Sequence, residues 1–172
     1  MSNSSISMYV ASVPLFQQML GGLSNFLTKA EAHATAKNIA PDVFLQSRVF
    51  PDMFNLTRQV QIACDFAKGT CLRLAGSEVP NIADTEVTFA DLQARIATTL
   101  ALIGAIPAAS INGSEERVIV TSPGTARERT FAGQAYLLTY AIPHFFFHTT
   151  TAYNILRHNG VEIGKKDFIG AN

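Results

Sequence analysis

The sequence has no excess of either charge and no long apolar run. Its 13 Lys and Arg residues equal its 13 Asp and Glu residues, so it lacks the basic face that nucleic-acid binding requires. Polar or helix-disfavouring residues interrupt every apolar run before it could span a bilayer. The N-terminal residues Met1–Ser5 carry no positive charge and no apolar signal-peptide core. We therefore expect a cytoplasmic protein with neither nucleic acid nor a membrane as its main partner.

Cysteine is scarce, with only Cys64 and Cys71 present. They lie seven residues apart on one predicted helix, and a rise of roughly 10 Å between them excludes a disulfide within that helix. We predict two buried thiols, and the alternative is a reactive or metal-binding role.

Apolar residues make up 48% of the 172 residues and charged residues only 15%. This composition is typical of a globular protein with a substantial core. The chain has no internal repeat and no low-complexity segment, so we expect a single domain over residues 1–172.

Four segments show the three- and four-residue spacing of apolar side chains that predicts helices, at 12–36, 51–76, 88–106 and 131–158. Residues 108–130 interrupt the pattern with a β-prone run and a turn signal, which indicates a short hairpin or loop. The sequence therefore predicts an all-α four-helix bundle with a short hairpin or loop excursion between its third and fourth helices.

Proline and capping residues indicate where these helices begin or bend. Pro51 suits a first helical position, and Thr88 with Asp91 forms a capping-box-like start for the third helix. Pro41 is compatible with a short helical turn in the connection before Pro51. Pro143 lies inside the fourth predicted helix, where it should bend the helix and free a carbonyl group.

Two of the four histidines, His144 and His148, lie four residues apart on the fourth predicted helix. This spacing turns one side chain only about 40° from the other and offsets the two by one helical turn. On a helical wheel both fall in the inward-facing apolar stripe. Neutral imidazoles so placed could bind one divalent metal ion, with zinc or nickel as the candidates.

Gln59 is the polar residue nearest the centre of the buried face of the second predicted helix. It is therefore the candidate to face the histidines across the bundle, as a weak metal ligand or as a hydrogen-bond partner of a histidine or a metal-bound water. Gln61 and Asp65 fall nearly opposite, and we expect them to be solvated.

A metal-free structure remains an alternative. Two core histidines bonded to Gln59 or to a tyrosine would need no metal ion. Phe145, Phe146 and Phe147 span more than half of the helix circumference, so at least one should point away from the core. An exposed aromatic patch of this kind most often forms a dimer surface.

The stretch from His144 to Gly160 resembles the last-helix signature of the DinB/YfiT-like superfamily of metalloenzymes. The whole chain is similar to an uncharacterised bacterial branch of that superfamily, a domain of unknown function. The residues that carry this closer likeness are Pro51–Phe54, Arg58–Val60, Leu74–Gly76, Tyr153 and Leu156–Gly160.

The resemblance implies an up-down-down-up four-helix bundle, often dimeric, with a metal site of three histidines. Two of these match His144 and His148, and the third belongs on helix two, where Gln59 holds the approximate place. Many members continue after the second histidine with Arg-Gly, whereas this chain has Thr149 and Thr150.

Two hypotheses follow. The first is a divalent-metal-binding hydrolase or thiol transferase that uses His144, His148 and Gln59. The second is a non-catalytic homodimeric bundle whose degenerate metal site binds a small ligand or a partner.

Overall fold

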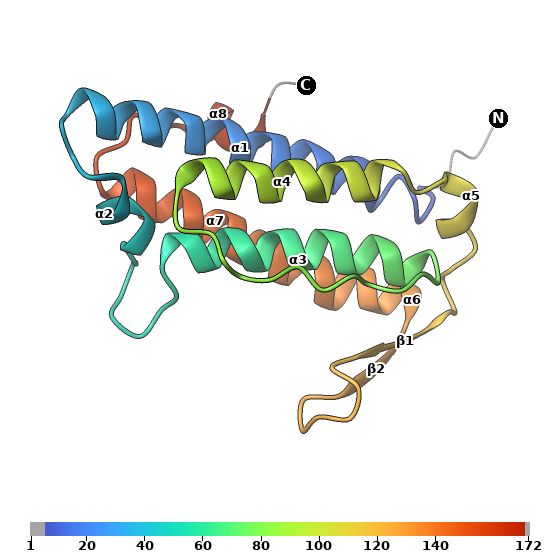
Figure 1. Ribbon diagram of the computed structural model, residues 1–172. Helices are drawn as coiled ribbons and strands as arrows, with labels where there is room; N and C mark the ends of the chain where they lie inside the picture. Colours follow the sequence, from blue (N-terminus) through green and yellow to red (C-terminus); the bar gives the residue numbers. More distant parts are fainter. Residues whose placement is uncertain (1–5, 171–172) are drawn as a thin grey trace.

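The computed structural model describes residues 6–170 (Figure 1). The N-terminal stretch Met1–Ser5, in which no targeting signal is expected, lies outside that range, as do residues 171–172. Within residues 6–170, no helix has both the length and the apolar character needed to cross a membrane.

Four long helices form the bundle. They are α1 (Val13–Ala36), α3 (Leu56–Leu74), α4 (Phe89–Gly104) and α7 (Ile142–His158). Helix α3 packs against α4 and α7, and α1 packs against both of these helices. In Figure 1, α1 and α7 run in one direction and α3 and α4 in the other, which confirms the predicted up-down-down-up bundle.

The parallel course of α3 and α4 depends on the long connection between them. Residues 75–88 leave the C-terminal end of α3 and return along the outside of that helix before α4 begins (Figure 1). Thr88 then caps α4 with the predicted capping box, because its hydroxyl accepts from the Asp91 N–H at 3.1 Å and the Asp91 carboxylate accepts from the Thr88 N–H at 2.9 Å.

Helix α3 begins five residues later than Pro51 suggested. The N-cap is Asn55, whose side-chain oxygen accepts from the Arg58 N–H at 3.0 Å. The asparagine side chain accepts a hydrogen bond from an otherwise unpaired N–H of the first helical turn. A proline side chain has no acceptor atom and cannot cap a helix in this way. Residues 47–55 instead connect α3 to the short helix α2 (Pro41–Gln46). This helix lies where a short helical turn was expected after Pro41.

The excursion between the third and fourth long helices is a β-hairpin, as predicted. A short helix α5 (Ala108–Ile111) leads into the antiparallel strands β1 (Val118–Thr121) and β2 (Arg129–Ala132). Figure 1 shows the hairpin projecting from the bundle near the end of α3. Phe131 therefore belongs to a strand and not to the start of the fourth helix, because it pairs with Ile119 across the hairpin.

The fourth helix is not a regular α-helix along its whole length. Three residues of α6 (Gly133–Ala135) lead into the π-helical segment η1 (Tyr136–Ala141), and α7 follows without a break. Pro143 lies at the start of α7 and has no N–H to donate. The π turns of η1 lie just before Pro143, whose missing N–H breaks the α-helical hydrogen-bond pattern of that turn. Segments of π-helix are frequent at functional sites.

The C-terminal residues add one short helix, α8 (Lys165–Ile169), which packs on α1. Asp167 pairs with Lys29 at 2.6 Å. Gly22 of α1 allows α8 to pack this closely on α1, because a Cβ atom at position 22 would collide with the backbone carbonyl of Phe168.

The core confirms the prediction for both cysteines. Cys64 and Cys71 are free and buried. Burial raises the pKa of each thiol to about 12, so neither is a thiolate at neutral pH.

Candidate histidine site and adjoining pocket

His148 is buried and hydrogen-bonded across the bundle. Its Nδ1 lies 2.7 Å from Oε1 of Gln59, and Nε2 of Gln59 donates to the backbone carbonyl of Phe54 at 3.1 Å. A carbonyl can only accept, so this second bond fixes the orientation of the Gln59 amide. The Nδ1 of His148 must then be the donor, which leaves its Nε2 with a free lone pair in the neutral ring.

His144 is fixed in the same tautomer. Its Nδ1 lies 2.7 Å from the backbone carbonyl oxygen of Tyr140, which again can only accept. The prediction that both histidines are buried is wrong for His144, which is exposed. The expectation that Gln59 faces the pair is confirmed by its bond to His148.

Aromatic rings cover one side of both histidines. Phe66 stacks on His144 with ring centroids 4.9 Å apart and on His148 at 6.1 Å. Tyr140 contacts the His144 ring at 4.3 Å. Phe147, the residue before His148, is 57% exposed, which confirms that one phenylalanine of this run points away from the core.

Burial, together with the smaller effects of the nearby His144 and Arg58, lowers the pKa of His148 to about 4. An imidazole loses the solvation of its charged form when it is buried, and neighbouring cationic groups add repulsion. His148 is therefore neutral at pH 7.

The arrangement meets part of the requirement for a metal centre. Each histidine presents a free Nε2 and donates from Nδ1 to an oxygen, as metal-ligating histidines commonly do. A catalytic zinc ion, however, takes three protein ligands. No group of three or more His, Cys, Asp or Glu side chains within residues 6–170 is placed to hold a metal ion.

The oxygen of Gln59 is already the acceptor for His148, so Gln59 acts in this geometry as an orienting partner. The three-ligand centre that the family resemblance implies does not fit these residues. A direct bond from Gln59 to a metal remains a prediction.

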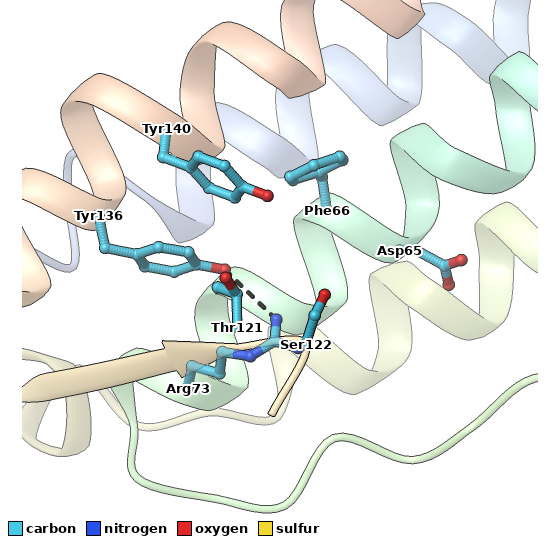
Figure 2. Close-up of a pocket in the computed structure, with 7 residues that line it drawn as sticks. All are labelled: Asp65, Phe66, Arg73, Thr121, Ser122, Tyr136 and Tyr140. Carbon is cyan, nitrogen blue, oxygen red and sulfur yellow. Dashed lines mark hydrogen bonds between the residues drawn. The ribbon is translucent and has the colours of Figure 1, made fainter. Parts of the chain in front are cut away.

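A pocket of about 180 Å³ adjoins the aromatic wall of the histidine pair (Figure 2). We call it the hairpin pocket, because the end of β1 forms one side and helix α3 and segment η1 form the others. Its lining residues are Asp65, Phe66, Arg73, Thr121, Ser122, Tyr136 and Tyr140. Phe66 and Tyr140 belong to both the pocket and the histidine site, so the two lie next to each other.

The hairpin pocket has hydrogen-bonding groups at its base. Arg73 donates to the hydroxyl of Tyr136 at 3.3 Å, as Figure 2 shows, and that hydroxyl lies 3.4 Å from Oγ1 of Thr70. Ser122 occupies the left-handed region with φ of 48°, which is uncommon for a residue other than glycine. Sequence reasoning missed this pocket, because its residues come from three segments whose approach depends on the hairpin.

An ionic cluster around the buried Arg95 was also missed. Arg95 of α4, whose side chain is 1% exposed, pairs with Asp65 at 2.9 Å, Asp84 at 3.1 Å and Glu86 at 2.9 Å. Gln61 donates to Glu86 at 2.8 Å. The expectation that Gln61 is solvated is therefore wrong, because the connection 75–88 covers it.

This cluster balances its own charge. Three cations, Arg58, Lys68 and Arg95, face three carboxylates through the ion pairs of the cluster. Burial alone would raise the pKa of Glu86, but hydrogen bonds from Arg95 and Gln61 hold it below its ordinary value. The cluster thus attaches the connection to α3 and α4.

Comparison with known proteins assigns the family. Residues 8–169 match the family described as a domain of unknown function, DUF1993. A solved structure of a DinB family member from Shewanella denitrificans is 43% identical and superimposes with a TM-score of 0.87, over 95% of this chain and 92% of that one. None of the curated proteins matches the chain. The chain therefore belongs to the DUF1993 family, a DinB-like family of unknown function.

Proposed function

We propose that this DinB-like protein is a ligand-binding helical bundle that takes a small molecule in the hairpin pocket. In this proposal His144, His148 and Gln59 form a hydrogen-bonded wall beside the pocket and do not form a three-ligand metal centre.

The observation that carries the proposal is the hairpin pocket itself, which shares Phe66 and Tyr140 with the histidine site. The hydrogen-bond chain from His148 through Gln59 to the Phe54 carbonyl supports the absence of a three-ligand metal centre. This chain engages the amide oxygen of Gln59, the expected third ligand, in a hydrogen bond to His148. The hydrogen bonds of the two histidine rings lead to a backbone carbonyl and an amide, and none within residues 6–170 leads to a carboxylate that could act as a general base.

A second candidate function is divalent-metal binding through His144 and His148 alone, with hydrolase or thiol-transferase activity as the finer hypothesis. It is supported by the two free Nε2 atoms and by the neutral state of His148 at pH 7. Zinc and nickel remain the metals to test, because imidazole nitrogen suits both.

Zinc and nickel titration of untagged protein, followed by calorimetry, separates the two candidates. We expect only weak binding by the parent, because the site offers two free Nε2 atoms, those of His144 and His148, whereas a catalytic zinc ion takes three protein ligands. His158→Ala is the matched control, because His158 is exposed at the end of the same helix.

Stoichiometric zinc or nickel binding at submicromolar concentration by the parent, lost in both His144→Ala and His148→Ala, would overturn the proposal in favour of the metal-binding candidate. Retention of that binding in the two variants would place the metal elsewhere.

We also propose that the protein is a homodimer. The supporting feature is an apolar groove of about 470 Å³ between the connection 47–55 and helix α7. Its lining residues are Val49, Met53, Phe146, Phe147, Thr150, Thr151 and Asn154.

A further inference from the structure

The hairpin pocket offers an arginine, Arg73, that no carboxylate of the described residues neutralises. None of the ion pairs among residues 6–170 includes Arg73. Asp65 also lines the pocket, but its Oδ1 is engaged by Arg95 at 2.9 Å and Lys68 at 3.1 Å. Figure 2 shows the Asp65 carboxylate turned away from Arg73 and Tyr136.

Several hydroxyl groups share the pocket with this guanidinium. Tyr136 accepts a hydrogen bond from Arg73, so its own proton remains for Thr70 or for a ligand. Ser122 and Tyr140 bring two more hydroxyl groups to the lining. A pocket that combines a guanidinium with several O–H donors is suited to an oxyanion, because charge-assisted hydrogen bonds are the strongest that such groups make.

The remaining walls are aromatic. Tyr140 contacts Phe66 with ring centroids 5.9 Å apart, Tyr136 at 5.9 Å and Phe131 at 5.0 Å. Such rings pack favourably against a planar apolar group. The volume of about 180 Å³ is below the roughly 300–1,000 Å³ of sites for drug-sized ligands, so the ligand must be small.

We infer that the hairpin pocket binds a small organic anion, whose oxyanion group pairs with Arg73 and whose planar body packs on Phe66 and Tyr140. This inference rests on the proposed ligand-binding function and adds the chemical class of the ligand.

Calorimetric titration of the full chain with three probes tests the inference. Benzoate carries both a carboxylate and a planar ring, benzamide carries the ring without the charge, and inorganic phosphate carries the charge without the ring. We expect benzoate to bind with a Kd in the millimolar range or tighter, and at least about tenfold more tightly than either of the other probes.

Variants at the arginine locate the binding. Arg73→Gln should weaken benzoate binding at least about tenfold, and Arg73→Lys should weaken it less, because the charge remains while the planar fork is lost. Arg157→Gln is the matched control, since Arg157 is exposed at the far end of α7, and it should leave the Kd unchanged. The melting temperature of each variant shows whether it is folded. Tyr140→Leu gives a second readout should Arg73→Gln not fold, and should also weaken benzoate.

Three outcomes would overturn the inference: no binding of benzoate by the parent, equal binding of benzamide or phosphate, or unchanged affinity in folded Arg73→Gln and Tyr140→Leu. If benzamide binds as tightly as benzoate and Tyr140→Leu weakens its binding, the proposed ligand-binding function stands, but the ligand need not be an anion. Tight zinc binding lost in His144→Ala and His148→Ala would contradict the proposed function itself, whatever the benzoate result.

Discussion

The buried environment of His148 should make the stability of the folded protein depend on pH. Its ring is buried between α3 and α7, and its proton on Nδ1 is committed to Gln59. Protonation of Nε2 would place a positive charge in this buried position near Arg58. The folded protein therefore resists a proton that the unfolded chain accepts.

We predict that the free energy of unfolding falls as the pH falls from about 6.5 to about 4. The ordinary pKa of 6.5 applies to the unfolded chain, and the folded value is about 4. Above pH 6.5 His148 is neutral in both the folded and the unfolded state, so the two states bind the same number of protons there and stability no longer depends on pH through this residue. Between the two values the unfolded state binds more protons, so stability is lost by about 2–3 kcal/mol across the window.

Urea unfolding in the presence of a chelator, at a series of pH values, measures this loss. His148→Gln should remove most of the dependence between pH 6.5 and 4, and the exposed His158→Gln should keep it. An identical pH dependence in the parent and His148→Gln would show that His148 titrates normally in the folded protein.

The limits of sequence reasoning are visible at the same residues. Helical periodicity placed Gln59 opposite the histidines, and the bond to His148 agrees. Periodicity gives the direction of a side chain but not how far its neighbours cover it, so it could not show that His144 is exposed. Gln61 lies on the outer face of α3 as expected, yet Glu86 and the connection 75–88 bury it through contacts distant in sequence.

At the scale of elements, the packing of α8 on α1 depends on one of two adjacent glycines. Gly21 is exposed, and a Cβ atom added there meets nothing within 4 Å. Gly22 is buried under α8, where a Cβ atom would collide with the Phe168 carbonyl. Replacing either glycine with alanine is the same chemical change, but the two replacements should alter the stability of the protein in opposite directions.

We predict that Gly21→Ala stabilises the protein by about 0.5–1 kcal/mol, because alanine is the better residue in a helix interior. Gly22→Ala should destabilise it by about 1–3 kcal/mol, because the backbone of α8 must move. Urea unfolding measures both changes. Hydrogen exchange over α8 should rise in Gly22→Ala and stay unchanged in Gly21→Ala, and stabilisation by both alanines would show that α8 does not pack on α1 as described.

The long elements were predictable because each follows from a local pattern. Apolar spacing gave the four helices, and Thr88 with Asp91 gave the start of α4. The β-prone run at residues 117–120 indicated a hairpin or an extended loop, and the strand β1 forms there. The start of α3 was missed because Pro51 was expected at its first turn, whereas Asn55 provides the cap. The π-helical segment η1 was missed because π turns have no period of their own in the sequence.

At the scale of the whole molecule, the fold identifies the family but not the activity, because one fold supports many different sites. The ionic cluster around Arg95 neutralises itself and fixes the connection 75–88, so it is committed to structure. The hairpin pocket and the apolar groove both remain open at the surface, and they lie on different segments of the chain. Ligand binding and self-association can therefore be tested separately.

We predict that the proposed homodimer forms through the apolar groove and that Phe147→Glu dissociates it. Phe147 is 57% exposed and lines the groove, so a carboxylate there would be buried without a partner in a dimer. Sedimentation velocity should give twice the chain mass of 18.6 kDa for the parent and the single mass for Phe147→Glu. Leu138→Glu is the matched control, because Leu138 is a similarly exposed apolar residue that does not line the groove. A parent that sediments as a monomer would contradict the dimer, and dissociation by Leu138→Glu alone would move the interface to η1.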